Sequence, residues 1–425
     1  MSPPTSFLRI IQFLGLFGTG YHVLALPNLN LRDTKPDWLQ GPSIIEVLGS
    51  VRNVYPAADF NRDVTTSWWH TEVLDGASSE DSDKFNTALK EAEFIVLNQD
   101  MYKLLGIKDY KESKTVEKLF KFPPGPSFAK RLVHDGTVYS PECNCLFFAE
   151  LHPPQKGFSA DAMPWMWRTN LNATPPTTEK VYPSPQLTMG NGAYYHKGSV
   201  YWAQEGNHTN PGGIVKMDPL TLQTEVVLNN FFGRRFNSPN DVAITRGSVA
   251  YFTDGYYGYD NFNNTLKPEL ANGVWRWDMS TGDLRQVSGA GGGPFTNPNG
   301  VALNLEENKL YVTNRGNASD NPAGGRTIYE FDINKTGLPI KGGTVFAYVD
   351  TGFPDGIKLD KDGRVYGGIT GGVIVYDKSG KLLGLVKTEE EDVAVNMQWI
   401  DDRLYIVGRD YLYRVQLNSG GVNKY

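Results

Sequence analysis

Residues 238–254 read SPNDVAITRGSVAYFTD, and this stretch decides the fold. A Pro-Asn-Asp corner leads into the apolar run 242–244, and a polar turn at 245–248 leads into a second strand-like run at 249–253. This pattern predicts one β-hairpin. Asn240 and Asp241 are poor strand formers, so their place at the start of a strand, directly after a proline, needs a further explanation.

The same hairpin recurs along the chain, each time beginning with a polar residue. The first residues of the copies are Asp135, Asn191, Asn240, Asn299, Asp355 and, in a weaker copy, Asn396. They are spaced by 41 to 59 residues, and further strand-like runs lie between them, for example at 273–278, 327–332 and 373–377. Units of about fifty residues with four strands each are typical of β-propellers. We therefore predict an all-β fold, a six-bladed β-propeller.

The propeller is expected to span residues 94–425. The apolar run 94–97 could supply the outer strand of the last blade and so close the ring. Residues 26–93 do not fit the repeat and are expected to form an irregular N-terminal extension, with a short helix near 82–94. Residues 1–25 resemble a signal peptide, with Arg9 before an apolar run and small residues near position 25, although a buried N-terminal strand is the alternative.

The amino-acid composition argues against two classes of binding partner, nucleic acids and membranes. The formal charge is −6 and no cluster of Lys and Arg stands out, which argues against a nucleic-acid partner. No stretch reaches the ~20 apolar residues of a membrane span, so no membrane partner is expected either. The signal peptide predicts a secreted protein, and five Asn-x-Ser/Thr sequons, at Asn172, Asn207, Asn263, Asn317 and Asn334, suit a secreted glycoprotein. The two cysteines, Cys143 and Cys145, allow either a strained disulfide or two reduced thiols.

The polar residues that begin the hairpins suggest a metal site. The inner strands of a propeller line its central channel, so residues at equivalent points of several blades converge on the axis. Asp135, Asn240, Asn299 and Asp355 would bring two carboxylates and two amide oxygens together, which suits Ca²⁺ better than Zn²⁺. Repeated turns offer a competing explanation, because Asn-Gly and Asp-Gly are common turn formers. A metal site is favoured because the polar corner precedes the inner strand, whereas the hairpin turn follows it.

Other chemistry finds less support in the sequence. No Gly-x-Ser-x-Gly elbow occurs, which removes a serine hydrolase from consideration. His134 directly precedes Asp135 and could hydrogen-bond a substrate, with a structural role as the alternative.

Four strings resemble a known family: HDGTVY (134–139), NSPNDVAI (237–244), NPNGVAL (297–303) and FPDGIKLD (353–360). In this order and spacing they are similar to the SMP-30/gluconolactonase-like propellers, more closely to the fungal secreted lactonohydrolases, with a layout like that of the paraoxonases. The resemblance covers roughly residues 94–415. It implies a six-bladed propeller that binds a divalent metal, usually Ca²⁺, on its axis and hydrolyses lactones.

The resemblance also assigns roles to residues of this chain. Asp355 would be a metal ligand and the catalytic base, Asn299 a metal ligand, and Asn240 a ligand or a catalytic residue that orients the substrate. Asp135 stands where the family carries a Glu. Its side chain is one carbon shorter, so Glu150, at the end of the paired strand, is a possible substitute.

Asn191 stands where paraoxonase-like enzymes carry a histidine, and it is expected to contact the substrate together with His134 and Glu150. The resemblance thus predicts a secreted, calcium-dependent lactonase acting on a small-molecule lactone. An isomerase or cyclase on the same scaffold, and a non-catalytic binding propeller with a structural calcium, are the alternatives.

Overall fold

The computed structural model describes residues 38–48, 79–124, 133–151, 166–289, 295–316, 325–338, 343–350, 352–389 and 392–422. All of them belong to one compact unit, Asp37–Tyr425. The predicted signal peptide lies outside the described residues. No described helix is long and apolar enough to cross a membrane.

Five antiparallel four-stranded sheets form most of this unit, as the recurring hairpin predicts. Each is given from its inner to its outer strand. The first three are β5 (Val133–Ser140), β6 (Cys145–Leu151), β7 (Met166–Asn170) and β8 (Thr177–Val181); β9 (Gly190–His196), β10 (Ser199–Gln204), β11 (Gly213–Met217) and β12 (Thr224–Leu228); and β15 (Pro239–Ile244), β16 (Val249–Asp254), β17 (Gly273–Asp278) and β18 (Leu284–Gly289). The other two are β19 (Pro298–Leu303), β20 (Lys309–Arg315), β21 (Arg326–Asp332) and β22 (Thr344–Tyr348); and β27 (Asn396–Ile400), β28 (Arg403–Val407), β29 (Tyr411–Gln416) and β4 (Glu117–Lys121).

A seven-stranded sheet takes up the remaining hairpin, the one that begins at Asp355. Its strands, from the inside outward, are β23 (Ile357–Leu359), β24 (Val365–Ile369), β25 (Gly372–Tyr376), β26 (Leu382–Lys387), β3 (Phe94–Val96), β2 (Ile44–Glu46) and β1 (Leu39–Gln40). The expectation of six four-stranded blades is therefore wrong, because five sheets have four strands and this one is extended by three strands from the N-terminal region.

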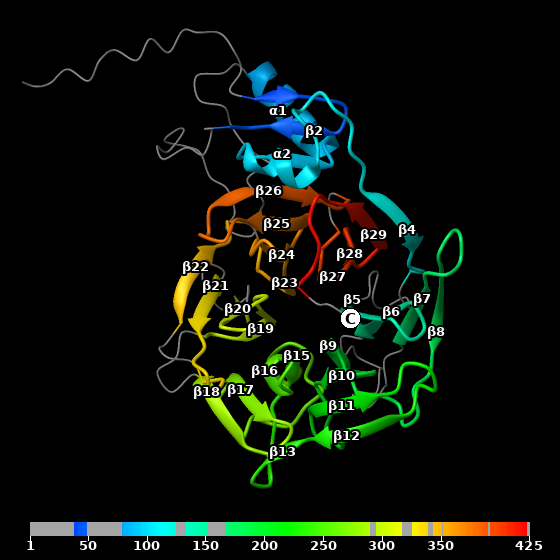
Figure 1. Ribbon diagram of the computed structural model, residues 1–425, viewed down its shortest axis with the longest axis vertical. Coiled ribbons are helices and arrows are strands. Elements are labelled where there is room, and N and C mark those ends of the chain that lie inside the picture. The colour runs from blue at the N-terminus through cyan, green and yellow to red at the C-terminus, as the bar shows by residue number, and fades with distance from the viewer. Residues whose placement is uncertain are drawn as a thin grey trace, which may run out of the picture. The chain divides into compact units, whose positions relative to one another are not determined.

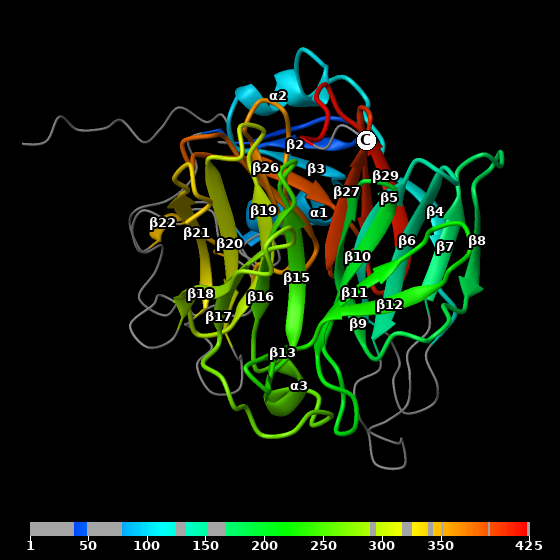
Figure 2. The ribbon, with the colours of Figure 1, turned by 60° about the horizontal axis from the view of Figure 1, so that its bottom comes forward.

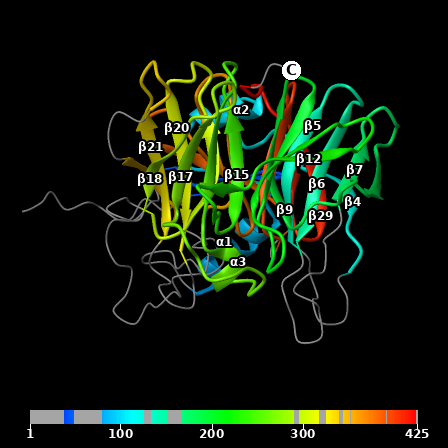
Figure 3. The same cartoon turned by 90° about the horizontal axis from the view of Figure 1, so that it is seen from below.

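The inner strands surround a common axis (Figure 1). In chain order, β5, β9, β15, β19, β23 and β27 each contact the next, and β27 contacts β5 again. Viewed from the side, the sheets stand beside one another around this axis (Figure 3). The apolar core lies between neighbouring sheets, where large side chains such as Trp202 and Trp275 are fully buried.

The ring is closed by a different strand from the one expected. Strand β4 pairs antiparallel with β29, so Glu117–Lys121 completes the last sheet. The run at 94–97 does contain a strand, but β3 pairs with β26 of the neighbouring sheet. Its side chains are fully buried there, which explains why this run is the more apolar of the two.

Three helices complete the described elements: α1 (Ser79–Glu91), α2 (Asp100–Leu105) and α3 (Tyr257–Asp260). Helix α1 lies close to the helix expected near 82–94. Its apolar residues Phe85, Ala88 and Leu89, at helical spacing, pack against the seven-stranded sheet. A small hairpin of β13 (Asn230–Phe231) and β14 (Arg234–Arg235) and helix α3 lie beyond the ends of the strands (Figure 2).

The polar corner that begins a hairpin coincides with a β-bulge or register irregularity in four of the sheets. The ladder between the inner strand and its partner shifts register between Asp135 and Val138, between Gly190 and Ala193, between Pro239 and Val242, and between Pro298 and Val301. A bulge leaves its residue unpaired in the ladder and redirects the side chain. Asn240 and Asp241 therefore begin a strand because the strand is bulged at this point.

The described residues include those of two expected covalent modifications, a disulfide bond and N-glycosylation. Cys143 and Cys145 are free thiols, and the thiol of Cys145 donates a hydrogen bond to the Cys143 carbonyl at 3.1 Å. Asn207 is buried, and its Oδ1 accepts hydrogen bonds from the backbone N–H groups of Thr209 and Asn210. Glycosylation at Asn207 is therefore incompatible with the folded state.

Candidate active site in the central channel

The residues that begin the inner strands meet at one end of the channel. Asn396 Nδ2 donates a hydrogen bond to Asp135 Oδ1 at 2.8 Å, although 261 residues separate the two along the chain. A Cβ atom added to Gly300 would lie 2.7 Å from the carbonyl oxygen of Asp355, and one added to Gly356 would lie 2.5 Å from Asn396 Cγ. Each corner thus packs directly on the corner of the next sheet, as the sequence predicts.

Two threonines link consecutive corners in the same way. The Thr253 hydroxyl accepts a hydrogen bond from the N–H of Asp241 and donates one to the carbonyl of Asn299. In the next sheet, the Thr313 hydroxyl accepts from the N–H of Gly300 at 2.7 Å and donates to the carbonyl of Asp355, also at 2.7 Å. These hydrogen bonds fix the backbone from which Asn240, Asn299 and Asp355 extend.

Asp355 lies buried among polar partners. Its Oδ2 is 3.7 Å from Nε of Arg315, the last residue of β20, which has 32% of its side chain exposed. Burial raises the pKa of the Asp355 carboxyl, while the charges of Arg315 and Arg409 and a hydrogen bond from Asn299 act in the opposite direction. A carboxyl group with a raised pKa, close to neutral amides, is suited to accept a proton.

Asp135 is the second buried carboxyl group of the channel. Burial, together with the charge of Asp355, raises the pKa of Asp135 to about 7 against the hydrogen bonds from Asn396 and Gly136. The charge of Asp355 thus acts on Asp135. The structure therefore brings together the two carboxylates that the repeat pattern singles out, with Asn240 and Asn299 buried between them along the ring.

Asn191 forms an acid–amide pair with a residue that sequence reasoning missed. Its Nδ2 donates to Glu205 Oε1 at 2.7 Å, and both side chains are buried. Burial raises the pKa of Glu205 to about 8, opposed by the Asn191 hydrogen bond and assisted by the charges of Asp135 and Asp355. Glu205 is thus a third buried carboxyl group on which the charges of Asp135 and Asp355 act.

The neighbouring pair Asn240–Asp241 divides into two roles. Asp241 accepts a hydrogen bond from its neighbour Val242 N–H at 2.8 Å and another from Val301 N–H at 3.2 Å, in the next inner strand. Asp241 therefore links β15 to β19. That Asn240 lines the channel stays a prediction.

Of the two remaining predicted contacts, Glu150 is not brought into this site. Glu150 Oε2 accepts a hydrogen bond from Trp167 Nε1 at 2.8 Å and lies 3.5 Å from Lys180 Nζ, both on outer strands of its sheet. The expectation that Glu150 replaces Asp135 in the channel is therefore wrong. His134 is part of β5, and its side chain lies outside the described residues.

Helix α3 adds a residue at the channel mouth that the sequence did not indicate. Tyr257 is buried, and its hydroxyl donates to the carbonyl of Asn297 at 3.1 Å, while Gly258 N–H donates to Ser238 Oγ at 2.7 Å. The helix thereby joins the segments that lead into β15 and β19.

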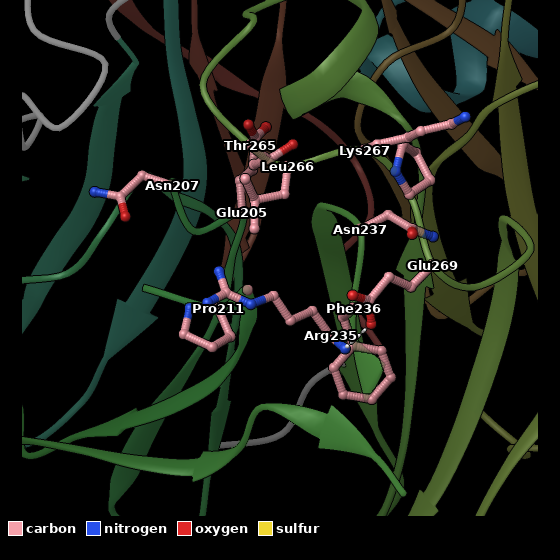
Figure 4. Close-up of a pocket in the computed structure, with 12 residues that line it drawn as sticks. Glu205, Asn207, Pro211, Arg235, Phe236, Asn237, Thr265, Leu266, Lys267 and Glu269 are labelled. Atoms are coloured by element: carbon pink, nitrogen blue, oxygen red, sulfur yellow. Dashed lines mark hydrogen bonds between the residues drawn. The ribbon is translucent and has the colours of Figure 1, made fainter. Parts of the chain in front are cut away.

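A small pocket adjoins the channel beside Glu205 (Figure 4). The loop after α3 contributes Thr265–Glu269, and the segment before β15 contributes Arg235–Asn237. The Thr265 hydroxyl is buried in it without a hydrogen-bond partner, as is Oε2 of Glu205.

The channel residues fit a divalent cation. The donors are carboxylate and amide oxygens, the ligands that Ca²⁺ prefers, and the buried carboxyl groups raise one another's pKa, which a bound cation would relieve. Among the described residues, no three His, Cys, Asp or Glu side chains lie close enough to bind a metal by themselves. Amide oxygens would therefore have to complete the coordination.

Several known proteins are similar to this chain in sequence. Two curated relatives are the gluconolactonase of Zymomonas mobilis, 34% identical over 197 residues (44% of this chain and 51% of the relative), and lactonohydrolase oryL of Aspergillus oryzae, 26% identical over 356 residues (78% and 76%). The match thus spans about half the length of the Zymomonas protein.

Solved structures show the same fold at lower identity. A gluconolactonase from Xanthomonas campestris superimposes with a TM-score of 0.60 at 21% identity, covering 76% of this chain and 94% of the other. A calcium-binding protein, regucalcin, from Agrobacterium tumefaciens gives 0.50 at 13%, covering 72% and 95%. Residues 172–408 match the family described as SMP-30/Gluconolactonase/LRE-like region, which is more than half of the chain. The chain belongs to this family.

Proposed function

We propose that this protein is a metal-dependent hydrolase that opens a lactone ring to a hydroxy acid. The observation that carries the proposal is the buried Asp355 carboxyl group at the channel mouth, close to Arg315 and hydrogen-bonded to Asn299. Membership of a family with gluconolactonase and lactonohydrolase relatives supports the same reaction class.

In the proposed reaction, Asp355 acts as the general base. A water molecule hydrogen-bonded to its carboxylate loses a proton to it while the water oxygen attacks the lactone carbonyl carbon. The bond from this carbon to the ring oxygen then breaks, and the proton passes from Asp355 to the alkoxide that is released. The product is a hydroxy acid with one new carboxyl group and one new hydroxyl group. It contains all the atoms of the lactone and of the water molecule.

Polar neighbours of Asp355 would orient the substrate and stabilise the developing charge. The Asn240 amide can hydrogen-bond the lactone, and the Arg315 guanidinium lies where it can stabilise an oxyanion on the carbonyl oxygen. The threonine hydrogen bonds described above fix the backbone next to Asn240 and at Asn299, which limits how far these residues would have to reorganise during the reaction.

A divalent cation would be held by oxygens of Asp135, Asn240, Asn299 and Asp355, and we propose Ca²⁺. When bound, such an ion polarises the carbonyl group as a Lewis acid. The hard oxygen donors favour Ca²⁺ over softer metals, and a regucalcin described as calcium-binding shares the fold.

The test is hydrolysis of aldonolactones by the wild type, with and without EDTA, and by an Asp355→Ala variant. We expect EDTA to abolish activity without unfolding the protein, and Asp355→Ala to reduce kcat at least about a hundredfold. A matched Asp377→Asn variant, changed in an exposed turn, should keep full activity. Full activity in Asp355→Ala would overturn the assignment, and an EDTA effect on the melting temperature alone would indicate a binding propeller.

The protein is also proposed to be secreted, on the strength of the apolar segment after Arg9. N-terminal sequencing of the protein recovered from the culture medium tests this. A mature chain that begins near residue 26 is expected, and an unprocessed chain retained in cells would contradict it.

A further inference from the structure

The turn of the first hairpin carries the two cysteines of the chain. It joins β5 to β6, with Cys143 in the turn and Cys145 at the start of β6. Asn144 between them has a φ of 49°, in the left-handed region, and its N–H donates a hydrogen bond to the Pro141 carbonyl at 3.2 Å. The Cys145 thiol donates to the Cys143 carbonyl at 3.1 Å and is also within hydrogen-bond reach of the Cys143 sulfur. The turn therefore places the two sulfurs beside each other.

Neighbouring side chains fix the backbone of this turn. Asn144 Oδ1 accepts a hydrogen bond from the Tyr139 hydroxyl at 2.9 Å, and Asn144 Nδ2 donates to Asn172 Oδ1 at 2.9 Å. Asn172 Nδ2 in turn donates to the Cys143 carbonyl at 3.2 Å. Two reacting groups that are held together in this way react faster than groups that must first find each other.

The two thiols differ in access and in acidity. Cys143 is half-buried, whereas Cys145 is 4% exposed. A hydrogen bond from the Cys145 thiol, together with the charge of Arg168, lowers the pKa of Cys143 to about 7 against the effect of burial. The same hydrogen bond, with burial, raises the pKa of Cys145. Because the thiolate is the nucleophile in thiol–disulfide exchange, Cys143 is the thiol with which a dissolved disulfide reacts first.

The charged groups around the pair come from several elements. Arg168 of β7 acts on both sulfurs, and its guanidinium also contacts Glu179 Oε1 of β8 at 2.5 Å. Glu142, in the turn itself, accepts a hydrogen bond from the hydroxyl of Tyr195 in β9. Tyr139 of β5 is neutral near pH 7, because burial raises its pKa. The Arg168 cation thus favours the thiolate form of the nearby cysteines.

We propose that Cys143 and Cys145 form a reversible dithiol–disulfide couple that exchanges with small-molecule disulfides such as oxidised glutathione. The Cys143 thiolate attacks one sulfur of the small disulfide, forms a mixed disulfide and releases one small thiolate. The Cys145 thiol then gives its proton to that thiolate, its sulfur attacks Cys143 Sγ, and a second small thiolate leaves. Overall, the two cysteines lose two electrons and two protons, and the small disulfide takes them up to become two thiols.

The disulfide formed in this way is expected to be labile. Its ring spans a single intervening residue, which strains the bond and makes it easier to reduce. Excess small thiol should therefore restore the dithiol, a property of regulatory and catalytic disulfides rather than of structural ones. The inference is independent of the proposed function, because the turn follows the end of β5 opposite to the Asp135 corner.

The test uses the full-length protein, treated with a reductant that is then removed, incubated with oxidised glutathione and weighed by mass spectrometry of the intact chain. We expect the wild type to lose two free thiols and to retain no glutathione. Cys145→Ser should instead hold one glutathione on Cys143, because the second sulfur is missing. The matched variant Cys143→Ser should react at least about tenfold more slowly, because Cys145 is buried.

Alkylation by iodoacetamide gives a second measurement that does not depend on either serine variant. Peptide mapping of the wild type after brief treatment should find the label on Cys143 before Cys145. The alkylation rate should rise with pH with a midpoint near 7. In Cys145→Ala, which lacks the hydrogen-bond donor, the midpoint should move up toward the ordinary thiol value of about 8.5.

A wild type that keeps both thiols in oxidised glutathione would overturn the inference, as would one that retains glutathione as a stable adduct. Labelling of Cys145 before Cys143, or a disulfide that excess reduced glutathione does not reopen, would do the same. Thermal melting reports folding for every variant. Lactonase activity of the reduced wild type is assayed separately, and its outcome bears on the proposed function alone.

Discussion

Adjacent residues of the same corner serve different purposes, as Asn240 and Asp241 illustrate. Asp241 uses its carboxylate oxygens on backbone N–H groups of two inner strands, so its contribution is to the fold. Asn240 is the residue of the pair that is predicted to line the channel. A similar division separates Glu205 from Gln204, whose Oε1 accepts a hydrogen bond from Thr188 N–H. A bulge or a strand end determines which of two neighbouring polar side chains is directed toward the channel, and so which of the two can take part in function.

Asp254 permits a prediction about pH and stability. Burial raises the pKa of Asp254 to about 7 in the folded protein, whereas an unfolded Asp has a value of about 3.9. Between these values the folded state keeps a proton that the unfolded state has lost. The free energy of unfolding should therefore fall as pH rises from about 4 to about 7, by about 4 kcal/mol from this group.

Urea unfolding at pH 5, 6, 7 and 8 checks this expectation in the wild type and in Asp254→Asn. The variant has no proton to lose at this position, so its free energy of unfolding should depend less on pH over the same interval. Equal pH dependence in the two proteins would contradict the raised pKa.

At the scale of the hairpin, the close contact of neighbouring corners depends on glycines. A Cβ atom on Gly192 would collide with the carboxylate and Cα of Asp241 in the next sheet. We expect Gly192→Ala to lower the free energy of unfolding by about 2 kcal/mol or more, and to lower kcat as well, because it displaces the corner that carries Asn240. Chemical denaturation and a lactonase assay measure the two effects.

Gly247→Ala is the matched control for this prediction. Gly247 lies in the turn between β15 and β16, in the hairpin that carries Asp241, and an added Cβ would approach Thr245 Oγ1 only to 3.7 Å, an ordinary contact. Its stability and activity should stay close to those of the wild type. A Gly192→Ala protein as stable and active as Gly247→Ala would contradict the proposed packing of the corners.

At the scale of the whole molecule, the ring depends on the pairing of β4 with β29. Lys121 is the cross-strand partner of Tyr411. Replacing both by cysteine should allow a disulfide that closes a loop of about 290 residues. In the chain-entropy model such a link stabilises the folded state by about 6 kcal/mol. The melting temperature of the oxidised variant should exceed that of its reduced form, and equal values would contradict the ring closure described here.

The sequence predicts the channel better than it predicts the periphery. Asp135, Asn240, Asn299 and Asp355 are recognisable because each begins a local hairpin pattern that recurs. Glu205 is not, because it follows a strand by one residue and no pattern distinguishes that position. The apolar run at 94–97 suggested the closing strand, whereas Glu117–Lys121 carries three charged residues and gives no comparable signal. A polar strand such as Glu117–Lys121 pairs with whichever distant strand still has an unpaired edge. The local sequence does not indicate which strand that is.

The closing strand also sets the order of events during synthesis. Glu117–Lys121 leaves the ribosome early, but its partner Tyr411–Gln416 follows only about 290 residues later. Until β29 has been synthesised, the last sheet is incomplete and β4 lacks its partner strand. A nascent chain that stalls before residue 411 would thus carry an open edge, the kind of surface on which other chains aggregate and which chaperones protect. Termination before residue 411 would remove the final strand and, with it, the closure of the ring.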